Sequence, residues 1–147
     1  FLESNNSVGV LDNQMTAMTV LRHSGIVFAF NSQIWNKFKL GELVSFLDNK
    51  TGKPSLRNTV YEPQEGDMPL PTIQGIKDLQ KRGSMFCVCD LATKVYGSAI
   101  ASAQGLNPDD VYKEMVEGIL PGIKLVPSGV WALGRAQNEK CAYIFAG

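Results

Sequence analysis

The chain has 147 residues, with 44% hydrophobic and 19% charged residues, which is ordinary for a globular protein and fits a single domain over 1–147. Its 14 Lys and Arg residues balance 14 Asp and Glu residues, so no basic excess exists to hold a nucleic-acid backbone. No apolar run approaches the ~20 residues of a membrane-spanning helix. We therefore expect no nucleic-acid partner and no membrane span.

The first 13 residues are weakly patterned, and the polar run 5–7 with Gly9 is typical of a loop. We therefore expect no central strand in this part of the chain. Because the sequence begins with Phe1 rather than methionine, we expect that something upstream was removed or lies outside it. A removed export signal would leave no trace, so the compartment stays undecided between cytoplasm and periplasm.

Residues 15–21 are apolar and β-branched, which predicts a buried strand that ends near 22–25. The apolar run 26–30 fits either an extension of that strand or a short helical segment, and a turn at Ser24-Gly25 favours the helical segment. Asn31-Ser32 can cap a following helix, which Gly41 weakens. Its apolar residues fall mostly on one face: Ile34, Trp35, Phe38, Leu43 and Phe46.

Residues 48–71 are the least regular part of the chain and contain four prolines. We expect a long surface loop, which either covers the core without chemistry or contacts another subunit. Thr72 can cap a helix that ends at Lys81-Arg82-Gly83, because basic residues followed by glycine are a helix stop signal.

The second half alternates strands and helices. Strands are expected at 84–89, 123–126 and 141–145, and helices at 90–104, 107–120 and 130–137, the last capped by Ser128. This alternation predicts an α/β domain with a mostly parallel sheet and helices on both faces. With the strand at 15–21, the pattern gives four main strands.

Cys89 is the strongest candidate for chemistry, because it ends a strand that is followed directly by a helix. The helix dipole would favour its thiolate, while Asp90 would oppose the negative charge. The alternative is a buried cysteine that fills space. Cys87 lies two residues deeper on the same face of the strand, and we expect Cys87 and Cys141 to be core residues.

Three further residues follow expected strands on the same edge of a parallel sheet. His23 could tune a thiolate at Cys89, or it is an ordinary loop histidine. Ser128 and Gly129 form either a helix cap or an anion site. With three cysteines, one histidine and no metal-site or nucleotide-binding motif, we expect neither a metal nor a cofactor.

Four short segments in this order resemble the DsrE/DsrF-like family. They are Arg82-Gly83 with the strand that ends at Val88-Cys89, Leu120-Pro121-Gly122-Ile123, Val126-Pro127-Ser128-Gly129-Val130 and Cys141-Ala142-Tyr143-Ile144. The resemblance covers about 15–145 and fits least at 48–71, where this chain has a longer loop. The family's usual first strand would also lie before Met15, where no strand is expected.

The resemblance implies a flavodoxin-like three-layer sandwich of four to five strands that forms homo- or hetero-oligomers. It also implies that Cys89 matches a family cysteine that carries sulfur as a persulfide, with a sulfur-carrier protein as a partner. Two hypotheses for function follow. One is a thiol-dependent sulfur carrier or transferase that acts through Cys89, and the other is a non-catalytic oligomeric binding or assembly protein with the same fold.

Overall fold

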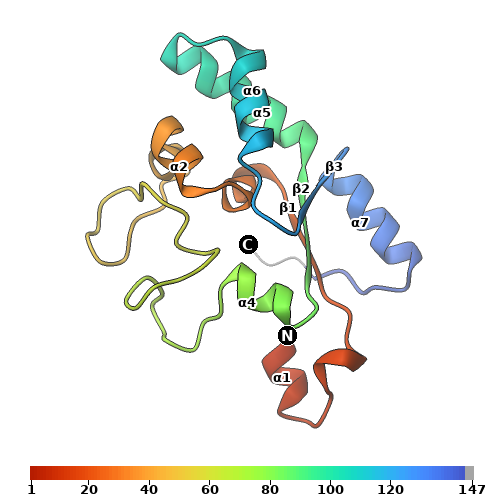
Figure 1. Cartoon of the computed structure of the whole chain (residues 1–147). Coiled ribbons are helices and arrows are strands. Elements are labelled where there is room, and N and C mark those ends of the chain that lie inside the picture. Colours follow the sequence, from red (N-terminus) through yellow and green to blue (C-terminus); the bar gives the residue numbers. More distant parts are fainter. Residues whose placement is uncertain (145–147) are drawn as a thin grey trace.

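The computed structural model describes residues 1–144, which form an α/β structure around a parallel sheet (Figure 1). The sheet has three strands in the order β1 (Met18–Leu21), β2 (Met85–Cys89) and β3 (Ile123–Val126). The helical segments are α1 (Leu2–Asn6), η1 (Asp12–Gln14), η2 (His23–Ala29), α2 (Ser32–Phe38), α3 (Leu40–Leu43), α4 (Ile76–Lys81), α5 (Asp90–Gln104), α6 (Pro108–Glu117) and α7 (Gly129–Asn138).

Both faces of the sheet are covered, as the alternation of strands and helices predicts. Figure 1 shows α7 on one side of the sheet and α2 and α4 on the other. On the α7 side, a Cβ atom at Gly129 would lie 3.3 Å from the Cγ1 atom of Val20. On the other side, Leu21 and Val88 are paired in register and enter the main hydrophobic core with Trp35. The sheet, with β2 at its centre, is therefore the middle layer between α7 on one face and α2 and α4 on the other.

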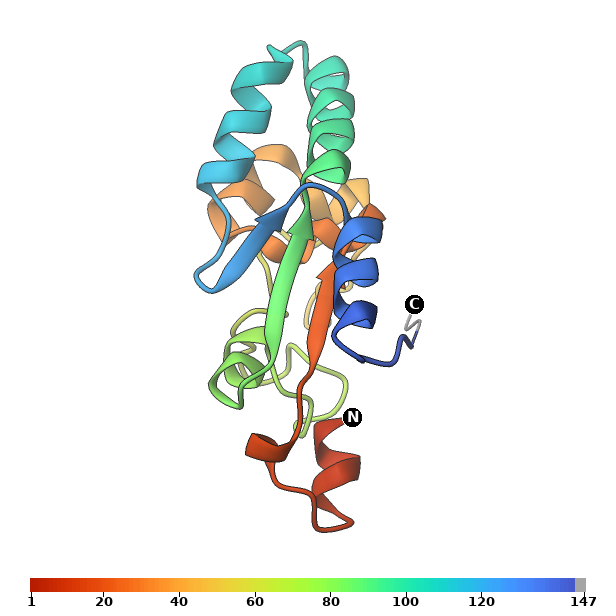
Figure 2. The ribbon, with the colours of Figure 1, turned by 90° about the vertical axis from the view of Figure 1, so that its right-hand side faces the viewer.

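The helices after β2 begin within one residue of their predicted positions, but α6 ends at Glu117 rather than at 120. The side-chain oxygen of Asn107 accepts the N–H groups of Asp109 and Asp110, and Pro108 occupies the first turn of α6. At the other end of the α5–α6 turn, Gly105 closes α5 in the left-handed conformation with φ of 66°. Figure 2 shows α5 and α6 side by side beyond the carboxyl end of the sheet.

The core is built on an aromatic cluster from η2, α2 and the segment after α3. The ring of Phe28 lies 5.8 Å from that of Trp35 and 5.2 Å from that of Phe46, measured between centroids. The Trp35 Nε1–H group donates to the carbonyl oxygen of Val27 at 2.8 Å, so the buried indole has no unpaired donor. Residues 26–29 of the apolar run lie in η2, as favoured, and are not an extension of β1, while Phe30 follows in an extended conformation.

The sheet has three strands among residues 1–144, so the expected four to five strands are wrong for this part of the chain. Residues 141–144, predicted to begin the last strand, form no strand, and Phe145 lies outside the described residues. The reason is local. The backbone N–H of Cys141 donates to the carbonyl oxygen of Ala136, so it completes the end of α7 and is not free for a β-ladder.

Other boundaries also differ from those predicted. The helix expected after Asn31-Ser32 is broken at Lys39, which has φ of 54°, into α2 and α3, and Phe46 lies beyond both. β1 begins at Met18 rather than Met15, and the helix expected from Thr72 begins only at Ile76, after Gly75. Gly75 packs so closely on the loop that a Cβ atom would lie 2.2 Å from the Cδ atom of Pro63. The first 13 residues contain no strand, as predicted, but residues 2–6 form helix α1 rather than a loop.

Arg82 holds the amino-terminal segment against the rest of the domain. Its guanidinium donates to both carboxylate oxygens of Asp12, at 2.7 and 3.0 Å, and to Glu3 at 2.5 Å. It also donates to the side-chain oxygens of Asn6 and Gln74. The hydrogen bond from Arg82 lowers the pKa of Asp12 to about 2. These long-range contacts explain how a weakly patterned segment acquires a defined position.

We expect Gly41→Ala to destabilise the protein by about 1–3 kcal/mol or more, although alanine is the better helix former. A Cβ atom at Gly41 would lie 2.2 Å from the carbonyl oxygen of Ser55, which is rigid backbone. The matched control is Gly25→Ala, because a Cβ atom there meets nothing within 4 Å. Urea unfolding of the two variants measures the effect, and a Gly41→Ala protein as stable as the wild type would show this packing to be wrong.

Candidate functional site

Cys89 is the residue that joins β2 to α5, and its polar atoms form hydrogen bonds with the first turn of α5. Its Sγ atom accepts the backbone N–H of Ala92 at 3.4 Å, so the thiol caps the helix. The Thr93 hydroxyl donates to the Cys89 carbonyl oxygen at 2.9 Å. The residue is 6% exposed. Cys89 therefore lies at the predicted junction, but behind other side chains rather than at an open surface.

Asp90, the next residue, is engaged by two partners. The Lys94 ammonium donates to one carboxylate oxygen at 2.8 Å, and the Tyr112 hydroxyl donates to the other at 2.7 Å. The hydrogen bond with Asp90 raises the pKa of both Tyr112 and Lys94. Lys94 also lies 5.3 Å from the centre of the Tyr112 ring. The charge of Asp90 is thus balanced by Lys94, and it opposes a Cys89 thiolate less than the sequence suggested.

The other predicted site residues lie near the same edge of the sheet without forming a site together. His23 begins η2 with an exposed side chain and φ of 47°. Within residues 1–144 it donates no hydrogen bond to Cys89 or Ser128. The Ser128 Oγ atom accepts the N–H of Trp131 at 3.1 Å, so the helix-cap interpretation is confirmed. Gly129 permits close packing, because a Cβ atom there would lie 3.1 Å from that of Arg22.

The three cysteines are all free thiols and differ in exposure. Cys87 is 4% exposed, so the core position predicted for it is confirmed, and burial raises the pKa of its thiol. Cys141, also predicted to be a core residue, is only partly buried, because the expected strand around it does not form. The most accessible thiol of the chain is therefore not the one at the strand–helix junction.

The loop 48–71 is held by buried polar residues as well as by Val60 and Tyr61, which pack against the core. Asn58 is its centre, since its side-chain N–H groups donate to the carbonyl oxygens of Phe28 and Phe30, both at 2.9 Å. Its side-chain oxygen accepts the N–H groups of Val60 and Tyr61 at 3.1 Å. All four hydrogen-bonding positions of this amide are filled. The loop thus takes one defined path across η2.

Asp67 is a second buried polar group in the loop, with a fully buried carboxylate. Burial alone would raise its pKa, but hydrogen bonds from Arg57, the backbone N–H of Gln64 and Lys50 outweigh burial and hold the pKa at about 2. The Gln64 N–H donates at 2.7 Å, and the Lys50 ammonium lies at 3.2 Å. This carboxylate fixes the position of Arg57 at the surface.

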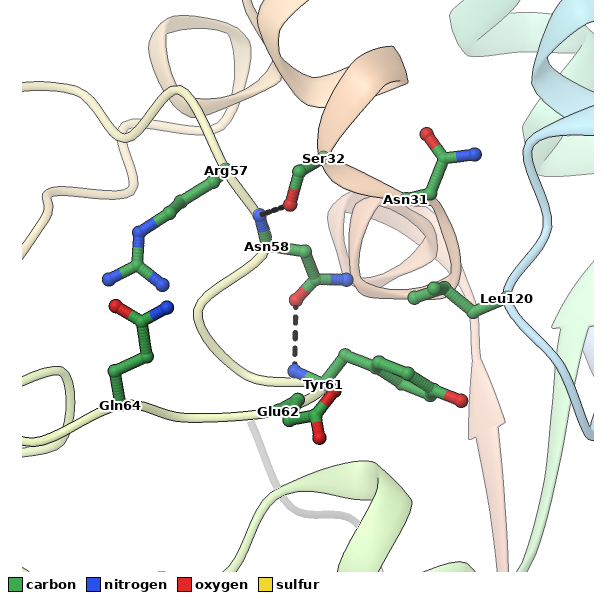
Figure 3. Close-up of a pocket in the computed structure, with 8 residues that line it drawn as sticks. All are labelled: Asn31, Ser32, Arg57, Asn58, Tyr61, Glu62, Gln64 and Leu120. Carbon is green, nitrogen blue, oxygen red and sulfur yellow. Dashed lines mark hydrogen bonds between the residues drawn. The ribbon is translucent and has the colours of Figure 1, made fainter.

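A polar pocket of about 210 Å³ opens between this loop and the start of α2 (Figure 3). Asn58 lies at its centre, and the guanidinium of Arg57 points toward the amide of Gln64. Nothing in the linear pattern of the loop marks these residues as neighbours of α2. The complete lining is Asn31, Ser32, Arg57, Asn58, Tyr61, Glu62, Gln64 and Leu120.

A second, more apolar hollow of about 350 Å³ lies between α1, α4 and the amino-terminal ends of β1 and β2. It is lined by Phe1, Leu2, Glu3, Ala17, Thr19, Thr72, Ile73, Gln74, Leu79, Arg82, Ser84 and Phe86. Neither hollow is lined by Cys89, His23 or Ser128. The concave surfaces and the predicted thiol site are therefore separate features of this fold.

Comparison of the chain with protein-family models, with curated proteins and with solved structures found no match. Within residues 1–144, no three His, Cys, Asp or Glu side chains gather closely enough to hold a metal ion. None of the helices in that range combines the length and the apolar character of a membrane span.

We expect Asp67 to contribute on the order of 2 kcal/mol of stability at neutral pH, because its pKa is about 2 in the folded protein and 3.8 is its ordinary value. A carboxyl group whose pKa is lower in the folded than in the unfolded protein stabilises the folded state. The full stabilisation is present above pH ~4, and it is lost as the pH falls through about 2. Urea unfolding of wild type and Asp67→Asn between pH 2 and 6 measures it. The difference between the two proteins should narrow toward pH 2, and a constant difference would contradict the assignment.

Proposed function

We propose that this chain is a non-catalytic binding or assembly protein that keeps a flavodoxin-like, DsrE-like α/β fold and acts as a homo-oligomer. The observation that carries this proposal is the environment of Cys89. Its thiol is 6% exposed and accepts the N–H of Ala92, so it serves as the cap of α5. A carrier thiol needs access to its partner as well as thiolate character. The burial of Cys89 supports a structural role for it.

The surface of α5 and α7 supports self-association. Leu91 and Val95 are four residues apart, hence on the same face of α5, and both are 59% exposed. On α7, Val130 and Trp131 are also more than half exposed. Large exposed apolar side chains that gather on a surface are typical of contact surfaces. The formal net charge of +0 does little to oppose association between copies.

A second candidate function, a sulfur carrier at Cys89, has one observation in its favour. The hydrogen bond from Ala92 and the amino terminus of the 15-residue helix α5 both stabilise a negative charge on Sγ. In that function, Cys89 would take the terminal sulfur of a partner protein's persulfide. The partner's S–S bond breaks, a new S–S bond forms at Cys89, and the partner leaves as a thiol. No net oxidation or reduction occurs.

Alkylation of the native protein separates the two functions. Because reactivity follows access as well as thiolate fraction, we expect Cys141 to react first and Cys89 and Cys87 to react slowly. Peptide mapping after iodoacetamide treatment gives the three rates, and Cys141→Ser should remove the fast phase. Rapid labelling of Cys89, together with a ~32 Da adduct of one sulfur atom on it that reductant removes, would instead support the carrier.

We expect light scattering to show a dimer or larger species at micromolar protein, and Val95→Glu to shift it toward the monomer. The reason is that a charge on the apolar face of α5 is costly to bury. Val8→Glu is the control, because Val8 is also exposed but lies outside α5 and α7. A monomeric wild-type protein, or equal dissociation of both variants, would rule out assembly through this face.

A further inference from the structure

We propose that the pocket between the loop 48–71 and the start of α2 binds a small monocarboxylate with a short apolar tail. The pocket involves neither Cys89 nor the exposed face of α5. This inference therefore goes beyond the proposed assembly function, and either one can fail without the other. It rests on three observations: a fixed framework, an arginine with free donors and a net positive charge behind the pocket.

The framework of the pocket is fixed before any ligand binds. Asn58, at its centre, uses all four hydrogen-bonding positions of its side-chain amide within the protein. Its backbone N–H donates to the Ser32 Oγ atom at 3.2 Å, which ties the loop to the first turn of α2. Gly41 and Ser55 pack without room for a single Cβ atom between them. Because the side chains and loop of this pocket are already ordered, binding a ligand there costs little conformational entropy.

Arg57 supplies the donors. Its Nη2 atom is committed to the buried carboxylate of Asp67, but within residues 1–144 its Nε and Nη1 atoms have no acceptor. The side chain is 30% exposed, and its guanidinium faces the pocket beside the amide of Gln64 (Figure 3). Asp67 accepts from Nη2, which carries two N–H groups, so the second N–H of Nη2 can form a fork with the N–H beside it on Nη1 or Nε. Such a fork matches the two oxygens of a carboxylate.

The charges behind the pocket favour an anion over a neutral ligand. Lys50 and Arg57 together carry two positive charges and Asp67 carries one negative charge, which leaves a net charge of +1 behind the pocket. Glu62 also lines the pocket, but its carboxylate accepts from the Lys77 ammonium at 2.6 Å, which offsets its negative charge. A carboxylate is therefore preferred to a neutral group of the same shape.

The remaining lining sets the size and polarity of the tail. The ring of Tyr61 and the side chain of Leu120 lie together on the side of the pocket away from Arg57 (Figure 3). They offer apolar surface to a short aliphatic chain. A volume of about 210 Å³ holds the equivalent of about seven water molecules. The ligand is thus a short-chain carboxylate rather than a nucleotide or a peptide.

The test is a titration of the ¹⁵N-labelled full chain with butyrate, followed by NMR. We expect the Arg57 Nε–H signal and the backbone amide signals of Asn58 and Tyr61 to shift, with a dissociation constant of about 1 mM for so small a ligand. Butyramide has nearly the same shape without the charge, and it should leave these signals in place. Equal shifts with butyramide, tighter binding of inorganic phosphate, or no shift with tens of millimolar butyrate would overturn the proposal.

Two matched variants test the position of the site. Gln64→Glu places a negative charge beside Arg57, and it should weaken butyrate binding roughly ten-fold or more, because the new carboxylate competes for the same donors. Gln64 is exposed and its side chain makes no hydrogen bond within residues 1–144, so the fold should tolerate this change. Gln33→Glu adds the same charge on exposed α2, outside the pocket lining, and should bind as the wild type does. Equal affinity of the two variants would overturn the proposal.

Discussion

Much of the structure depends on the hydrogen bonds of the buried Asn58 side chain. It joins the carbonyl oxygens of Phe28 and Phe30 to the backbone of the loop through four hydrogen bonds. Removing one member of such a network leaves several buried polar groups unpaired, at a cost of about 1–3 kcal/mol for each group. The same amide covers η2, fixes the loop and forms the centre of the polar pocket. Stability and the shape of a binding site thus depend on one residue.

The junction between β2 and α5 shows how a position suited to chemistry can be used for architecture. Helix α5 needs an acceptor for its first N–H groups, and the Cys89 thiol supplies one. The neighbouring carboxylate of Asp90 is taken by Lys94 and by Tyr112 from α6. Each polar group at the junction therefore has a structural partner. This arrangement favours a binding or assembly role over transfer of sulfur at Cys89.

Most regular elements of the second half can be predicted from the sequence, because their signals are local. Asn107 and Ser128 are followed directly by the helices that they cap, and Gly105 ends α5 through its own backbone freedom. The strand at 141–145 was predicted from an apolar run alone. Such a run does not show whether a neighbouring strand is present to pair with it, and residues 141–144 have none.

The sequence by itself determined the α/β class, the central strand that ends at Cys89 and the helix caps, since these depend on periodicity and on residues a few positions apart. Tertiary structure alone decided the burial of Cys89, the pairing of Tyr112 with Asp90 and the fixed path of the loop 48–71. The hydrogen bonds of Tyr112 and Asn58 that define the last two features join residues 22 to 30 positions apart. Their geometry is set by how helices and loops pack in space, which hydrophobic periodicity does not encode.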